Sequence, residues 1–129
     1  MADYTPVYSG GAQPFTLTTS AAVTGGTIAI ASGAGTAGVG TAAATTVIGV
    51  FAHDAASGAK VTIWPLENVE HEIVCANGIT AGGGVQAAAT GQVDPATTSI
   101  AAASAAGTLI GIATTTATST NKVRFVGRT

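Results

Sequence analysis

The sequence predicts a mainly β protein, a small antiparallel β barrel or sandwich with an extended N-terminal arm and at most one short helix. Apolar and polar residues alternate with period two in several short segments, as strands with one buried face require. Glycine-containing turns, such as residues 25–26, 77–78 and 82–84, separate these segments. With 129 residues, the chain suits one domain. We therefore expect an arm over residues 1–14 and a single β-rich domain over residues 15–129.

The first segment is predicted to be extended. Pro6 and Pro14 discourage a helix, and the glycine pair at residues 10–11 allows the arm to swing. Tyr4 and Tyr8 are the two tyrosines of the chain, and aromatic side chains anchor segments on partners at low entropy cost. The arm therefore either docks on a partner or packs back onto its own barrel.

Period-two alternation predicts strands at residues 15–18, 27–31, 60–64 and 69–75. In addition, one strand–loop–strand pattern occurs twice. Residues 46–50 and 60–63 (Thr-Val-Ile-Gly-Val, then Lys-Val-Thr-Ile) match residues 108–112 and 122–125 (Thr-Leu-Ile-Gly-Ile, then Lys-Val-Arg-Phe) at the same spacing. We interpret the two copies as related hairpins. Gly49 and Gly111 then mark a bulge, a tight bend or a close backbone contact at matching positions.

One segment, between Asp94 and Gly107, is a candidate helix. Asp94 is placed to cap it, Pro95 suits a first turn, and residues 100–106 are rich in alanine. The threonines and serines of the same segment have weaker helix propensity. An extended surface loop is therefore the alternative.

The composition restricts the classes of partner. Only 8% of the residues are charged, 47% are hydrophobic and the net charge is −2, which disfavours a disordered chain. Four basic against six acidic residues cannot form the basic stripe that nucleic acid needs. The uncharged segment 95–121 is too rich in small polar residues for a membrane span. With three Leu, three Phe and one Trp, the core is thin, so we expect a component of a protein assembly.

A glycine motif raises the possibility of nucleotide binding. Gly33, Gly35 and Gly38 have the spacing of the dinucleotide-binding fingerprint, and Asp54 follows at a suitable distance. That mechanism requires a helix whose first turn presents amides to the pyrophosphate, but residues 39–46 are too short and are interrupted by glycine. We expect a loop of small residues, and a nucleotide-binding enzyme using residues 33–38 remains the remote alternative.

His71 lies among Glu67, Glu70 and Glu72, which is a composition found in metal sites. On a strand, however, Glu70 and Glu72 face away from His71, and Cys75 on the same face is about 13 Å farther along. We therefore expect no metal site, a buried His71 with a hydrogen-bond partner, and glutamates on a solvated or intersubunit face.

The sequence also gives little support for nucleophilic catalysis. His53, Asp54 and Ser57 share one predicted hairpin loop, where close sequence neighbours cannot readily adopt the geometry of a triad. Cys75 is the only cysteine, so no intramolecular disulfide forms, and a buried apolar role is expected for it. We predict a protein that is not an enzyme, with no catalytic residue and no cofactor.

An ordered set of segments resembles the small head-decoration, or capsid-stabilising, proteins of tailed bacteriophages. After the arm these are residues 21–26, 48–50, 54–58 and 60–63, then residues 78–82, 90–93, 107–113 and 122–126. The resemblance covers most of the chain after about residue 14. The stretch 95–106 departs from it, being longer than the usual pattern.

The resemblance implies a structural virion protein that binds the outer surface of the expanded capsid and stabilises it. It implies homotrimers at threefold and local threefold positions, the major capsid protein as partner, and assembly in the bacterial cytoplasm. An N-terminal segment that orders against the shell would make Tyr4, Pro6 and Tyr8 the capsid-binding residues. The alternative is another phage structural component, a tail or fibre protein.

Overall fold

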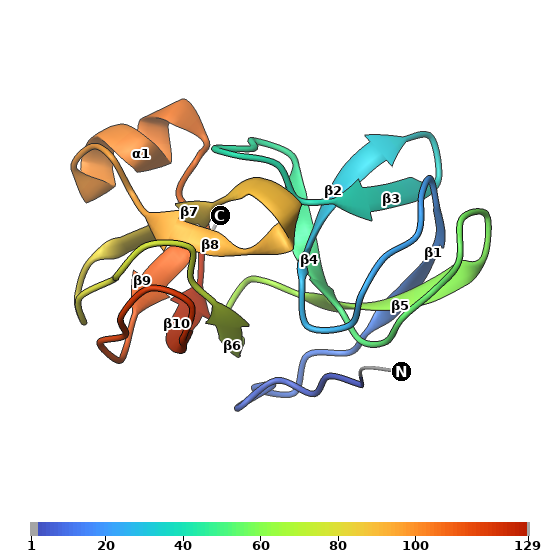
Figure 1. The fold of residues 1–129 in the computed structure, drawn as a ribbon, viewed down its shortest axis with the longest axis horizontal. Helices are drawn as coiled ribbons and strands as arrows, with labels where there is room; N and C mark the ends of the chain where they lie inside the picture. Colours follow the sequence, from blue (N-terminus) through green and yellow to red (C-terminus); the bar gives the residue numbers. More distant parts are fainter. Residues whose placement is uncertain (1–2, 129) are drawn as a thin grey trace.

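The computed structural model describes residues 3–128, so residues 1 and 2 of the predicted arm lie outside the described part. The described chain forms two strand-rich units that lie side by side in Figure 1. The elements of the first unit are β1 (Phe15–Thr19), β2 (Ile28–Gly33), β3 (Thr36–Val39), β4 (Val47–Phe51) and β5 (Lys60–Pro65). Those of the second are β6 (Glu70–Val74), β7 (Gly84–Ala87), a 3-10 turn (Ala89–Gly91), β8 (Val93–Pro95), α1 (Ile100–Ala106), β9 (Gly111–Ala113) and β10 (Lys122–Gly127).

The first unit is a closed barrel in the order β1-β3-β2-β4-β5, with β5 paired back to β1. All pairs are antiparallel except β1 with β3, which run parallel. The second unit is a sheet in the order β6-β10-β9-β7-β8. A parallel bridge between Cys75 and Val93 connects its first and last strands. The prediction of a mainly β barrel with one short α-helix is confirmed.

The second unit repeats the first, strand for strand and register for register. Ile28 pairs with Val50 as Gly84 pairs with Ile112, so equivalent residues lie 56 positions apart in the first three strands and 62 apart in the last two. The same offsets relate isolated bridges outside the strands. The offset of 56 also relates the parallel pair of Thr19 and Ala37 to the parallel bridge of Cys75 and Val93. The domain expected from residue 15 onward is therefore an internal duplication.

The two predicted hairpins are confirmed as the β4–β5 and β9–β10 pairs. Gly49 lies opposite Pro65, and Gly111 lies opposite Gly127 at the equivalent place. A side chain at Gly49 would collide with the carbonyl oxygen of Trp64, and one at Gly111 would lie 2.5 Å from the carbonyl oxygen of Val126. The matching glycines therefore mark a close approach of paired backbones.

The helix begins later than the sequence predicted. Asp94 and Pro95 belong to β8, where they pair with Gln86 and Val85 of β7. The α1 helix starts at Ile100, and the hydroxyl of its N-cap Ser99 accepts from the amide of Ala102 at 3.2 Å. The helix ends at Ala106, and its C-cap Gly107 has the left-handed conformation. Sheet pairing therefore overrides the local capping signal of Asp94. The helix lies in the connection between β8 and β9, which is where the offset between equivalent residues rises from 56 to 62.

Each unit encloses its own apolar interior, and a third set of contacts joins the two. Outer residues of the first unit, Ile28 and Val50, share a buried cluster with the interior of the second unit. The amide of Ala43 donates to the carbonyl oxygen of Ala87 at 2.9 Å, and the amide of Gly91 donates to that of Gly40 at 3.0 Å. Backbone hydrogen bonds therefore connect the two units. Within residues 3–128, no helix has the length and apolarity needed to cross a membrane.

Candidate functional site

The N-terminal arm packs along its own chain and contacts both units. Its start forms a bridge between Asp3 and His53, and its end forms one between Tyr8 and Glu70. The amide of Val7 donates to the carbonyl of Glu70 at 2.9 Å, and the amide of Glu70 donates to that of Tyr8 at 2.8 Å. In Figure 1 the arm, in dark blue, runs below both units. Of the two placements left open by the sequence, packing onto the same chain is the one in this structure.

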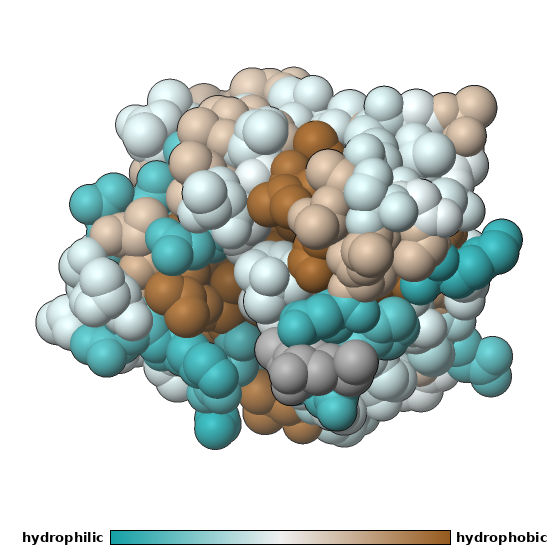
Figure 2. Space-filling model, turned by 45° about the vertical axis from the view of Figure 1, so that its right-hand side comes forward, coloured by the Kyte–Doolittle hydropathy of each residue, from teal (hydrophilic) through white to brown (hydrophobic). Residues whose placement is uncertain are grey.

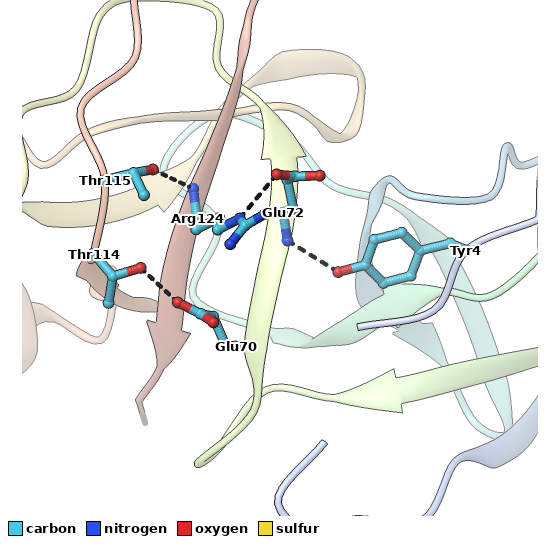
Figure 3. Close-up of polar contacts among 6 residues, drawn as sticks. All are labelled: Tyr4, Glu70, Glu72, Thr114, Thr115 and Arg124. Carbon is cyan, nitrogen blue, oxygen red and sulfur yellow. Dashed lines mark hydrogen bonds and ion pairs between the residues drawn. The ribbon is translucent and has the colours of Figure 1, made fainter. Parts of the chain in front are cut away.

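Tyr4 holds the arm in place through its hydroxyl group. The backbone amide of Glu72 donates to the Tyr4 oxygen at 3.1 Å (Figure 3). The same oxygen lies 2.8 Å from His71 Nδ1, while His71 Nε2 lies 2.8 Å from the carbonyl oxygen of Pro65. A carbonyl only accepts, so Nε2 carries the proton of the neutral imidazole, and the Tyr4 hydroxyl donates to Nδ1. These hydrogen bonds join the arm to β6 and to the end of β5.

Burial dominates the acid–base properties of this pair. Desolvation raises the pKa of the Tyr4 hydroxyl well above its usual value, with the nearby Glu72 carboxylate adding to the rise and the Glu72 amide opposing it. Burial lowers the pKa of His71 to about 4, against a smaller raising effect of the bond to Pro65. Tyr4 and His71 are therefore both neutral near pH 7, and their arrangement anchors the arm.

Removing the Tyr4 hydroxyl tests this anchoring. The substitution Tyr4→Phe leaves the Glu72 amide and buried His71 Nδ1 without the partner they share, so we expect a loss of about 1–2 kcal/mol in the free energy of unfolding. Urea denaturation measures it. Tyr8→Phe is the matched control, because the Tyr8 ring is 66% exposed, and its expected effect is below about 0.5 kcal/mol. Equal stability of the two variants would mean that the arm is not docked in solution.

The three arm residues singled out by the sequence have different environments. Tyr4 is half-buried and Pro6 is buried, both against this chain. Tyr8 projects outward with 66% of its surface exposed, and Val7 is 41% exposed. Of the predicted contact residues, Tyr8 is thus the one whose side chain is available to a partner.

Beside the arm, polar side chains cover the outer face of β6 and β10 (Figure 3). Arg124 Nε lies 3.0 Å from a carboxylate oxygen of Glu72, and the Thr114 hydroxyl donates to Glu70 at 2.7 Å. The amide of Arg124 donates to the Thr115 hydroxyl at 3.0 Å. Glu70 and Glu72 alternate with buried His71 along β6, as predicted. The carboxylates are thus directed away from the imidazole.

Sequence reasoning missed Val126, an exposed apolar residue on the outer face of β6 and β10. It is 37% exposed and lies between Glu70 of β6 and Ile112 of β9. The β10 pattern contained the signal, since the buried residues Val123 and Phe125 place Val126 on the opposite side with the charged residues.

The remaining candidate motifs do not assemble into a reactive site. Residues 33–38 run from the end of β2 through the turn into β3, and the next element is β4, so the helix that a dinucleotide fingerprint requires does not follow them. Asp54 instead accepts from the amide of Gly25 at 2.9 Å. His53 Nδ1 lies 2.9 Å from the Asp54 carbonyl oxygen, whereas the Ser57 hydroxyl is directed to Ser20. The described residues contain no group of three potential metal-ligating side chains.

Cys75 is buried and performs the same structural role as its equivalent in the first unit. Its thiol donates to the carbonyl oxygen of Thr118 at 3.3 Å, as the Thr19 hydroxyl donates to that of Ala56 at 2.6 Å. Burial raises the pKa of the Cys75 thiol, so the thiol stays protonated near pH 7. The cysteine therefore secures a turn.

Comparison with known proteins finds a structural neighbour. No family model matches the sequence, and no curated protein matches it. Among solved structures, the N base of head fibre gp8.5 from bacteriophage phi29 is similar, with a TM-score of 0.61 and 19% sequence identity. The match covers 90% of this chain and 93% of that one. At this identity the likeness establishes a shared fold.

Proposed function

We propose that this protein is a structural component of a tailed-phage particle that binds the outside of the expanded head and stabilises it. The observation that carries the proposal is the fold shared with the base of a phage head fibre over 90% of the chain. The ordered resemblance of the sequence to head-decoration proteins supports the same location, the outside of the phage head. The partner would be the major capsid protein, and the protein would associate as trimers at threefold and local threefold positions.

The surface suits dense packing of many copies. Most of the face in Figure 2 is pale, being neither strongly hydrophobic nor strongly hydrophilic, with separate brown and teal groups. A chain with 8% charged residues and a net charge of −2 generates little repulsion between crowded copies. Many neighbouring contacts on one shell then add avidity to individually modest interfaces.

Within this proposal, Tyr8 is the capsid-contacting residue, and Tyr4 and Pro6 act by holding the arm. A tyrosine brings a large apolar ring and a polar tip with few rotatable bonds, which makes it an effective anchor at interfaces. Val7 extends the apolar contact beside it. No catalytic residue, cofactor or metal enters the function.

The direct test is sedimentation of the protein with purified heads from its own phage. We expect saturable binding to expanded heads that lack the protein and none to compact precursor heads. Binding to neither form would overturn the proposal. Electron microscopy of saturated heads distinguishes compact knobs from elongated fibres. Compact knobs are expected, whereas elongated fibres would assign the chain to the base of a head fibre.

Tyr8→Ala is expected to weaken binding to expanded heads by about 2 kcal/mol, or roughly thirtyfold, because a central aromatic anchor is lost. Occupancy on the heads is measured as a function of free protein concentration. Phe15→Ala is the control, since Phe15 is another exposed aromatic residue, 37% exposed on β1, outside the arm. Equal losses in both variants would argue against the arm as the contact.

A further inference from the structure

The second unit closes on itself through a narrow seam, the place where the end of β6 meets β8. Cys75 and Val93 form a single parallel bridge there, and the amide of Ala76 donates to the carbonyl oxygen of Val93 at 2.9 Å. The first unit closes through two parallel pairs at the equivalent place, between β1 and β3. The seam of the second unit therefore has less backbone pairing than that of the first.

One hydrogen bond between side chains supplements the seam. Asn77 Nδ2 donates to a carboxylate oxygen of Asp94 at 3.0 Å, which joins the segment after β6 to β8. The equivalent residues of the first unit are Ala21 and Gly38, whose side chains offer neither a donor nor an acceptor. The bond between Asn77 and Asp94 therefore has no counterpart in the first unit.

Asn77 directly precedes Gly78, and this pair is suited to a reaction within the chain. Both residues are exposed. Gly78 has no side chain to obstruct an approach to its backbone nitrogen, and within residues 3–128 its amide donates no hydrogen bond. The nitrogen is therefore available to attack the side-chain carbonyl carbon of Asn77, once that side chain leaves Asp94.

The other two asparagines of the chain lack this combination. Asn68 precedes the β-branched Val69, whose amide donates to the carbonyl oxygen of Leu66 at 3.2 Å. Asn121 precedes Lys122, which has a long side chain and is the first residue of β10. In both cases the following nitrogen is obstructed by a side chain, so these asparagines serve as internal controls.

We propose that Asn77 is a site of spontaneous deamidation and that this modification opens the seam of the second unit. The Gly78 nitrogen forms a bond to the Asn77 side-chain carbonyl carbon, its proton leaves with the departing ammonia, and a succinimide ring results. Water then opens the ring at either carbonyl carbon and gives isoaspartate or aspartate. Water is the only other reactant, so the step requires no oxidant, cofactor or enzyme.

The modified side chain can no longer donate to Asp94. A carboxylate replaces the amide, so two negative charges face each other where a hydrogen bond joined the segments. Isoaspartate also adds one methylene group to the backbone beside the seam. Cys75, which is buried at the seam, then becomes more accessible. Attachment to a phage head plays no part in this reaction, so failure of head binding would leave it unaffected.

Peptide mapping by mass spectrometry follows the reaction in the full chain during storage in mildly alkaline buffer. We expect the amide to be replaced by an acid at Asn77 and to persist at Asn68 and Asn121. Gly78→Ala should slow the reaction at least about tenfold, because its methyl group obstructs the attacking nitrogen. That methyl group would lie 3.4 Å from the nearest atom, so the fold should persist. Equal modification of all three asparagines would overturn the proposal. So would an intact Asn77 after several times the period that converts a free peptide of residues 74–80.

Opening of the seam is tested with Asn77→Asp, which supplies the charge of the product directly. Cys75 is the single cysteine, so its rate of reaction with a thiol reagent in the native protein reports local opening. We expect this rate to rise about three- to tenfold in Asn77→Asp. Asn68→Asp is the matched control, the same change at an exposed residue before the other end of β6, and should leave the rate unchanged. An unchanged rate in Asn77→Asp, or an equal rise in both variants, would overturn the proposed opening.

Discussion

Replacing Gly111 by alanine is expected to lower the free energy of unfolding by about 3 kcal/mol, the upper end of the usual cost of overpacking a well-filled interior. The added methyl group would lie 2.5 Å from the carbonyl oxygen of Val126 and 2.6 Å from the Phe125 ring. The nearer atom is backbone of the paired strand β10, which cannot move without breaking the β9–β10 ladder. Urea denaturation gives the change.

Gly78→Ala is the matched control for this substitution. Gly78 is an exposed loop residue whose nearest atom would be 3.4 Å from an added methyl group, an ordinary contact. We expect its effect to stay within about 0.5 kcal/mol. The equivalent Gly49→Ala should resemble Gly111→Ala, since the same carbonyl of the paired strand lies in its way. A harmless Gly111→Ala would show that the two backbones are not in close contact at this point.

Lowering the pH from about 7.5 to about 4.5 is expected to remove about 2–3 kcal/mol of stability through His71 alone. In the folded protein, burial lowers the pKa of His71 from 6.5 to about 4, and the neutral ring accepts from Tyr4 and donates to Pro65. In the unfolded chain the imidazole titrates near its ordinary value. Between these two pKa values the unfolded state binds more protons, so the stability present above pH 6.5 is lost as the pH falls toward 4.

The measurement compares the unfolding free energy at the two pH values for the wild-type protein and for His71→Gln. The glutamine variant is less stable at neutral pH, but it should lack the His71 share of the pH dependence, about 2–3 kcal/mol. His53→Gln removes the other histidine and should keep the His71 share of the pH dependence. A His71→Gln protein with an unchanged pH dependence would mean that the imidazole is not buried in its neutral form.

The internal repeat explains why a chain with few large apolar residues folds into two filled interiors. Corresponding positions carry the same kind of contact, such as Thr19 and Cys75 bonding their turns or Gly49 and Gly111 passing close to a paired strand. Each unit needs only a small interior, and the contact between units buries further apolar surface, as in other repeat proteins. The arm and α1 lie outside the repeat.

The sequence alone determined the features that depend on local pattern. Period-two alternation identified β6 with His71 facing inward, and the repeated residues identified the β4–β5 and β9–β10 hairpins with their glycines. The proline and glycine content identified an extended arm. These features follow from the twofold period of a strand and from the backbone preferences of single residues, both of which can be recognised within a few positions.

What covers each surface depends on long-range packing. The tertiary structure extended the repeat to all ten strands, although most equivalent positions differ in residue type, and it took Asp94 and Pro95 from the expected helix into β8. It placed Tyr4 against His71, left Tyr8 outside, and covered Val50 while leaving its equivalent Ile112 half-exposed. Pairing and burial depend on residues far apart in the chain, so two segments with the same local pattern can differ in which of their residues are buried.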